Sequence, residues 1–208
     1  MWAETPLGPM PEALDALRSD SRVQVSSGEW FIFAPTGNRT TVGLIIYPGG
    51  RVDARSYAPA AHSIAAHGFL VVIVPMPLNL AVFAPDIALD VVSAFDNVTY
   101  WAIGGHSLGG TIAAQFAKNH PLLVQGLVLW ASYPDSGSDL SKGELRVVSI
   151  SATMDGLVTP DKIDASRALL PSTTKWFVIV GGNHAQFGWY GPQPGDNPAE
   201  ISHDAQQQ

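Results

Sequence analysis

The sequence predicts an α/β fold in which a mostly parallel sheet carries helices on both faces, and three observations support this. Apolar runs such as Thr41–Tyr47 lack polar alternation, which is typical of strands buried on both sides. Segments with helical spacing alternate with these runs along most of the chain. Nearer the N-terminus, Val23–Ser27 and Trp30–Pro35 alternate on either side of Ser-Gly, which predicts an antiparallel hairpin.

The expected elements follow one another as a single domain over residues 1–208. Residues 1–20 form a lead-in segment with a short helix over Pro11–Ser19, and residues 192–208 form a polar C-terminal tail. Further strands are expected over Phe69–Pro75, Tyr100–Gly104, Gly126–Ala131, Leu145–Ser151 and Lys175–Val180. Helices are expected over Ser56–His67, Pro85–Asp96, Leu108–Asn119 and Pro160–Leu170, the last with Thr159 as its N-cap. The segments between strands are too short to hold a separate cap domain.

Composition and charge narrow the classes of function. The 208 residues are 46% hydrophobic and 14% charged, which supplies enough apolar side chains for one core. Eleven Lys and Arg against eighteen Asp and Glu give a net charge of −7, so the surface field repels nucleic acids and anionic lipids. The sequence has no Cys to act as a thiolate nucleophile, and no apolar run long enough to span a membrane. The cellular compartment stays undefined.

A G-x-S-x-G motif centred on Ser107 stands between the strand Tyr100–Gly104 and the next helix. A sharp turn there strains the central residue and is tolerated only because Gly105 and Gly109, two positions away on either side, lack side chains. Ser107 would then project above the sheet as a nucleophile, and the Leu108 amide could donate to a developing oxyanion. A Ser placed by chance in a Gly-rich turn is the bland alternative. The glycine spacing does not fit the dinucleotide fingerprint G-x-G-x-x-G.

A base and an acid should follow the nucleophile in the order Ser, acid, His. His184 comes directly after the last buried strand, at the sheet edge where ligand chemistry collects. Asp155 follows the preceding strand and would hold His184 in the tautomer that accepts a proton from Ser107. The alternatives are His120 and His203 for the base, and Asp161 and Asp164 for the acid. An acidic residue early in a helix is already explained by the helix dipole, which favours Asp155.

The loop after the first buried strand, Tyr47-Pro48-Gly49-Gly50-Arg51, is expected to supply a second oxyanion donor. Its glycines let the backbone approach a bound carbonyl, and the amide of either Gly50 or Arg51 could face Leu108. The sequence does not choose between these two amides. Arg51 and Asp53 are better explained as a locally paired or solvated loop than as a clamp for a charged substrate.

The substrate pocket must be built from core loops, since no cap domain fits. The apolar segment 77–84 and the residues near the proposed base supply the candidates. We expect the lining to include Leu78, Leu80, Phe83, His106 and Phe187. Ordinary core packing is the alternative for such residues. An open, shallow pocket of this kind suits short acyl or small aryl esters.

These segments together resemble the α/β-hydrolases, and the similarity covers nearly the whole chain. The strings Tyr47–Asp53, Ser56–Pro59, Val74–Ala81 and Gly181–Gly188 are more specific, and they resemble the small bacterial alpha/beta hydrolase family 5, near the dienelactone-hydrolase-like esterases. The resemblance implies an α/β-hydrolase fold and a serine hydrolase, mostly a carboxylesterase, with Ser107, Asp155 and His184 as the catalytic triad. Members commonly carry an apolar N-terminal segment and a final helix that this sequence does not show. This departure implies a longer natural protein that is anchored or exported, or a partner over one sheet face.

The expected chemistry is ester hydrolysis through an acyl-Ser107 intermediate, with no metal and no organic cofactor. The expected partner is a small-molecule ester, without nucleic acid or a membrane span, and a homodimer is left open. Thioesterases, lactone hydrolases and acyltransferases can use the same triad and stay alternatives. A hydrolase fold kept only for binding is disfavoured because all three triad residue types are present. The Asp135–Asp139 loop lacks the full ligand pattern of a calcium loop.

Overall fold

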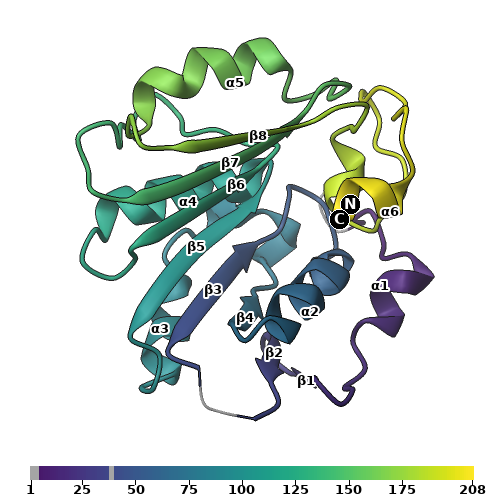
Figure 1. Ribbon diagram of the computed structural model, residues 1–208, viewed down its shortest axis with the longest axis vertical. Helices are drawn as coiled ribbons and strands as arrows, with labels where there is room; N and C mark the ends of the chain where they lie inside the picture. Colours follow the sequence, from purple (N-terminus) through teal and green to yellow (C-terminus); the bar gives the residue numbers. More distant parts are fainter. Residues whose placement is uncertain (1–4, 38–39) are drawn as a thin grey trace.

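An eight-stranded sheet forms the centre of the computed structural model, which describes residues 5–37 and 40–208 (Figure 1). The strands are β1 (Val23–Ser27), β2 (Phe31–Pro35), β3 (Val42–Tyr47), β4 (Leu70–Ile73), β5 (Tyr100–His106), β6 (Gly126–Trp130), β7 (Arg146–Ala152) and β8 (Lys175–Ile179). Their order across the sheet is β1-β2-β4-β3-β5-β6-β7-β8. The β1–β2 and β2–β4 pairs are antiparallel and the later pairs are parallel, which confirms the predicted antiparallel start and parallel continuation.

Helices cover both faces of this sheet (Figure 1). The α-helices are α1 (Pro11–Asp15), α2 (Ala58–Ala66), α3 (Ala88–Ala94), α4 (Leu108–Asn119), α5 (Pro160–Ser166) and α6 (His203–Gln207). Short 3₁₀ turns are η2 (Ala54–Tyr57), η3 (Pro77–Asn79), η4 (Ala81–Phe83), η5 (Arg167–Leu169) and η6 (Ala185–Phe187). Side chains of α3 and α4 pack on one face and those of α2 on the other. None of the helices within the described residues is long and apolar enough to cross a membrane.

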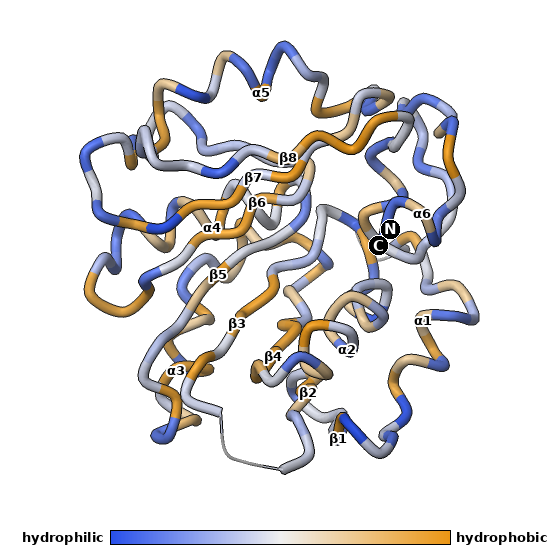
Figure 2. The backbone as a smooth tube through the Cα atoms, viewed as in Figure 1, coloured by the Kyte–Doolittle hydropathy of each residue, from blue (hydrophilic) through white to orange (hydrophobic). Residues whose placement is uncertain are grey.

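Strand β3 shows why its apolar run has no polar alternation. Ile45 and Tyr47 belong to the core on the α3–α4 face, whereas Leu44 and Ile46 belong to the core on the α2 face. Successive strand side chains point to opposite faces, so a strand covered on both sides needs an apolar residue at every position. Figure 2 shows the resulting hydrophobic stretches along β3 and β4.

Several helices and strands begin or end at other residues than the sequence predicts, because their backbone hydrogen bonds extend further or change type there. Strand β5 runs two residues beyond the expected end, to His106, because it keeps its ladder with β6. The expected helix Ser56–His67 begins as the 3₁₀ turn η2, and α5 likewise passes into η5 at Arg167. Thr159 occupies the N-cap position of α5, but its side chain makes no capping hydrogen bond.

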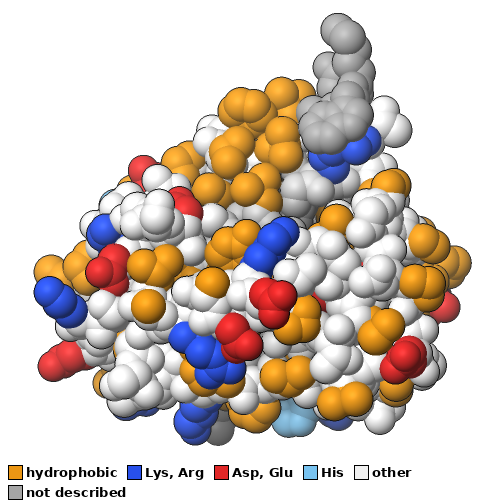
Figure 3. Space-filling model, turned by 90° about the horizontal axis from the view of Figure 1, so that it is seen from above, with side chains coloured by type: hydrophobic (Ala, Val, Ile, Leu, Met, Phe, Trp, Pro, Cys, Tyr) orange, Lys and Arg blue, Asp and Glu red, His pale blue; other side chains and the backbone are white. Residues whose placement is uncertain are grey.

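The last strand is wrongly expected to be buried. β8 lies at the edge of the sheet with β7 as its partner, and Phe177 and Val178 are 54% and 55% exposed. Because these two neighbours face opposite sides, both faces of β8 are open in part. Figure 3 shows hydrophobic side chains between charged ones on the surface seen from above.

The C-terminal tail is more structured than its polar composition suggests. Helix α6 ends the chain, and the Gln206 side chain is buried although the segment is polar. Its Oε1 accepts the Asn183 amide at 2.9 Å, and its Nε2 donates to the Asn183 carbonyl at 2.8 Å. The tail therefore holds the loop that precedes His184.

Candidate active site

The parallel strands deliver the predicted site residues to one edge of the sheet. β3 ends before the Pro48–Arg51 loop, β5 ends directly before Ser107, and β7 ends three residues before Asp155. β8 is followed after a short turn by His184. Because the carboxyl ends of parallel strands lie at the same edge, segments far apart in the sequence converge there.

Ser107 has the strained backbone that its motif predicts. Its φ is 52° and its ψ is −124°, which costs a residue with a side chain of the order of 1–3 kcal/mol. A Cβ added at Gly105 or at Gly109 would collide with the carbonyl oxygen of Tyr47. The two glycines thus allow the elbow to lie directly against the end of β3.

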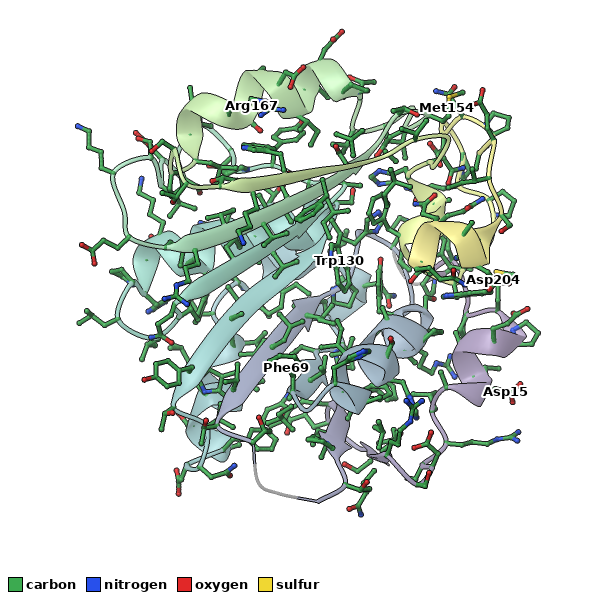
Figure 4. The ribbon with its side chains drawn as sticks, in the orientation of Figure 1. Asp15, Phe69, Trp130, Met154, Arg167 and Asp204 are labelled. Atoms are coloured by element: carbon green, nitrogen blue, oxygen red, sulfur yellow. The ribbon has the colours of Figure 1, made fainter. Side chains whose placement is uncertain are left out.

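Backbone contacts hold the elbow in this conformation. The Ser107 amide donates to the carbonyl of Trp130, the last residue of β6, at 3.0 Å; Figure 4 labels Trp130 at the end of the central strands. The Ser107 carbonyl accepts from the Ser132 hydroxyl at 2.7 Å and from the Thr111 amide at 3.2 Å. Sequence reasoning missed Ser132. Its position just after the end of β6 was the one signal in the sequence that could have indicated a role at the site.

His184 and Asp155 form a buried hydrogen-bonded pair. The distance from His184 Nδ1 to Asp155 Oδ2 is 2.8 Å, and both side chains are fully buried. The other oxygen, Asp155 Oδ1, accepts the amides of Leu157 at 2.9 Å and Val158 at 2.6 Å. His184 Nε2 is also buried and has no hydrogen-bond partner among the described residues. Since the ionised carboxylate only accepts, the proton of His184 lies on Nδ1 and its lone pair on Nε2.

The alternative candidates for the acid and the base have other surroundings and other partners. Asp161 is exposed in the first turn of α5, and Asp164 on the same helix bonds to Arg167 at 2.9 Å. His120 bonds to Asp86 at 3.0 Å. His203 stacks on Trp189 with ring centroids 3.9 Å apart.

His106 lies beneath the elbow as a buried neutral ring. Its side chain is 0% exposed, and its centroid lies 4.4 Å from that of His184 and 5.8 Å from that of Phe187. Burial holds the pKa of His106 well below its ordinary value. His106 and Phe187, expected in the substrate pocket, are therefore enclosed by protein in this structure.

Tyr57 connects His106 to the loop after β3. The Tyr57 hydroxyl accepts the Gly49 amide at 2.9 Å and lies 2.9 Å from His106 Nδ1. Because the Gly49 amide can only donate, the Tyr57 oxygen accepts that bond, and its O–H proton can be donated to Nδ1 of the neutral imidazole. Burial raises the pKa of Tyr57, so the hydroxyl stays protonated. Tyr57 falls within the expected helix Ser56–His67, and sequence reasoning assigned it no role at the site.

The two candidate oxyanion amides on the β3 loop are not equivalent. The Arg51 amide already donates to the Asn79 carbonyl at 2.8 Å. Gly50 faces the elbow, because a Cβ added there would lie 3.1 Å from Leu108 Cδ2 and 3.5 Å from Leu80 Cδ2. Asp53 forms a local pair with Arg55, at 2.7 Å between Oδ2 and Nη2, as expected for a locally paired loop.

Of the other three expected pocket residues, Leu78 lies on η3, Phe83 lies on η4, and Leu80 stands between the two turns. Leu78 and Phe83 are 49% and 58% exposed, and Leu80 between them is half-buried. Leu78 has a positive φ of 51°, which turns the chain sharply at this point. Leu78 and Phe83 form an exposed apolar rim, and Leu80 packs toward Gly50. Within residues 5–37 and 40–208, no group of three or more His, Cys, Asp or Glu is placed to hold a metal ion.

Comparisons with known proteins agree with this architecture. The sequence profile of the alpha/beta hydrolase family matches residues 43–208. Est1E from Butyrivibrio proteoclasticus with bound ferulic acid is 14% identical, covers 81% of this chain and 90% of its own, and has a TM-score of 0.64. The esterase Est2 from Thermogutta terrifontis is 14% identical (81% and 85% covered, TM-score 0.56). A putative dienelactone hydrolase from Klebsiella pneumoniae is 16% identical (75% and 81% covered, TM-score 0.58). No curated protein matches the sequence significantly.

Proposed function

The chain belongs to the alpha/beta hydrolase family, and on this premise we propose that it is a serine hydrolase that cleaves short-chain or small aryl carboxylic esters. The observation that carries the proposal is the buried His184–Asp155 pair. Nε2 of His184 has no hydrogen-bond partner among the described residues, and the His184 ring lies against His106, the residue before Ser107. An imidazole fixed on one side by a carboxylate and unpartnered on the other is the arrangement that a general base requires.

The proposed reaction has two halves. In the first, His184 Nε2 takes the proton of Ser107 as Oγ attacks the ester carbonyl carbon, and the resulting imidazolium protonates the leaving alcohol. In the second, water attacks the acyl-Ser107 ester, His184 accepts a proton from that water, and it returns a proton to Ser107 as the carboxylic acid leaves. Asp155 stabilises the positive imidazolium in both halves.

Two backbone amides are proposed to hold the oxyanion. The Leu108 amide is at the first position of α4, where helix amides have no partner within the helix and the dipole favours negative charge. Gly50 supplies the other amide in this proposal, since the Arg51 amide is occupied by Asn79. Removing one donor of this kind typically costs about 10²- to 10³-fold in kcat.

The experiment that tests the function is Ser107→Ala with p-nitrophenyl acetate as substrate. We expect a folded protein whose kcat is lower by about 10⁴-fold or more, because Ser107 contributes chemistry rather than packing. A fluorophosphonate probe should label the wild type and not the variant. Ser136→Ala, in an exposed loop, is the matched control and should retain full activity. A Ser107→Ala protein that keeps about a tenth of the activity would show that the nucleophile lies elsewhere.

A further inference from the structure

Asp196 lies in the C-terminal segment that passes beside both catalytic loops. Its Oδ2 accepts the amide of Ala185 at 2.8 Å. Its Oδ1 accepts the amide of Gly156 at 3.0 Å and that of Asn197 at 2.9 Å. Ala185 directly follows His184, and Gly156 directly follows Asp155. One carboxylate therefore bridges the residues next to both members of the pair.

The packing around Asp196 shows that these segments are closely fitted. A Cβ added at Gly156 would lie 2.8 Å from the Gly195 carbonyl oxygen and 2.9 Å from the Asn197 amide nitrogen, so a larger residue has no room. The Asn183 side chain donates to the Asn197 carbonyl at 2.7 Å, which ties the same segment to the residue before His184. Figure 4 shows Met154, next to Asp155, beside these C-terminal loops.

We propose that Asp196 is a positioning residue whose carboxylate sets the spacing between the Asp155 and His184 loops. The inference rests on the proposed function, because the pair it positions is the proposed base and acid. A shift of either loop would change the hydrogen bond from His184 Nδ1 to Asp155, and displacements of about 1 Å can cost about 10²-fold in rate.

The choice of a carboxylate at this position has a chemical reason. An ionised carboxylate has two acceptor oxygens and no donor, so it can receive an amide from each loop at once. An Asn side chain has one acceptor oxygen, and its NH₂ group would face a backbone N–H on one of the two sides. Asp196→Asn should therefore release one loop while changing almost nothing in volume.

The charge of Asp196 also reaches the site. Burial raises the pKa of Tyr190 well above its ordinary value, and the nearby carboxylates of Asp196 and Asp155 raise it further. Tyr190 lies 6.2 Å from the ring of His106, which in turn lies 4.4 Å from that of His184. The titratable groups nearest His184 are thus Asp155 from the β7 loop, His106 from β5 and, behind the Ala185 amide, Asp196. The hydroxyl group of Tyr57 and the ring of Tyr190 lie next to His106.

The test compares Asp196→Asn with the wild type and with Asp164→Asn, whose exposed carboxylate bonds to Arg167 on α5. We expect Asp196→Asn to lower kcat for p-nitrophenyl acetate by about 10- to 100-fold while KM changes by less than about twofold. The apparent pKa of the acid limb of kcat/KM should move to lower pH, because the imidazolium loses a nearby negative charge and a well-placed Asp155. Asp164→Asn should change neither quantity.

A second readout separates this inference from the proposed function. NMR titration of isotopically labelled histidine reports the pKa of His184 in the resting protein, and we expect the same downward shift there. Asp196→Glu, which keeps the charge but moves it by one methylene, should lower kcat and leave the acid limb nearer the wild type. A folded Asp196→Asn protein with wild-type kcat and an unmoved His184 pKa would overturn the inference. A wild type without Ser107-dependent ester hydrolysis would instead overturn the proposed function, and the NMR shift would still decide the role of Asp196.

Discussion

Replacing Asp155 by Asn tests the tautomer argument most directly, because the structure fixes how the new amide group must lie. Asp155 Oδ1 accepts two backbone amides, at 2.9 Å and 2.6 Å, whereas Oδ2 accepts one bond from His184. If the oxygen of the new amide took the Oδ2 side, its NH₂ group would lie against two buried donors, at a cost of about 1–3 kcal/mol for each donor left unsatisfied. The oxygen therefore stays on the Oδ1 side, and the NH₂ group faces His184.

An NH₂ group facing His184 Nδ1 reverses the imidazole tautomer. Nδ1 must then accept, so the proton moves to Nε2, where the lone pair is needed for Ser107. Because the side chain of Asp155 is fully buried, water is not available to replace the lost acceptor. We expect kcat to fall by about 10⁴-fold, which corresponds to a rise of about 5.4 kcal/mol in the activation barrier.

The assay is the saturating rate with p-nitrophenyl acetate, with circular dichroism to show that each variant is folded. Asp161→Asn and Asp164→Asn are the matched controls, since both side chains lie on α5 away from His184. They should keep close to wild-type rates. If Asp155→Asn retained more than about a tenth of the activity, or lost less than either control, the acid would have to be reassigned.

Two further predictions concern pH and substrate size. Burial keeps the pKa of His106 low, so below about pH 6.5 the unfolded chain takes up a proton that the folded chain does not. As the pH falls below this value, the free energy of unfolding should decrease by up to about 1.4 kcal/mol per pH unit. Urea unfolding between about pH 7 and 5 should show this slope, and His106→Asn should flatten it; an equal slope in both proteins would contradict the assignment. Activity on p-nitrophenyl esters should peak at short acyl chains, without a jump when substrate forms an emulsion, because the apolar rim at Leu78 and Phe83 is open. A steady rise with chain length below the solubility limit, up to about 0.8 kcal/mol per methylene, would instead indicate a deep acyl tunnel.

The sheet and the positions of the three proposed catalytic residues could be predicted because each depends on local signals. Buried parallel strands have a distinctive apolar run, and residues directly after such strands gather at one edge. The strained turn at Ser107 is likewise predicted by the glycines on either side of it. These features need no knowledge of which segments are neighbours in space.

The errors concern features that depend on neighbours. β8 looks like an interior strand because its side chains are apolar on both sides, but edge position is a property of the sheet order. The direction of His106 could have been foreseen from alternation along β5. Ala102 stands four residues before His106, and side chains at even spacing along a strand point to the same face. Ala102 packs on the α2 face, and His106 shares that face with Phe187. His106 is therefore enclosed by protein beside His184 and Phe187, although it stands next to Ser107 in the sequence.

The residues that sequence reasoning missed share one physical role, which is to fix backbone between separate loops. Tyr57 joins the β3 loop to the ring beneath the elbow, and Ser132 joins the end of β6 to the elbow itself. Asp196 joins the loops after β7 and β8. None of them stands in a catalytic motif, because a side chain that accepts from or donates to a distant backbone group needs only the right place in space. Loss of one such bond removes about 1 kcal/mol of stability, but it also frees a loop whose position controls the rate steeply. Variants at these positions should therefore lose activity well before they lose the fold.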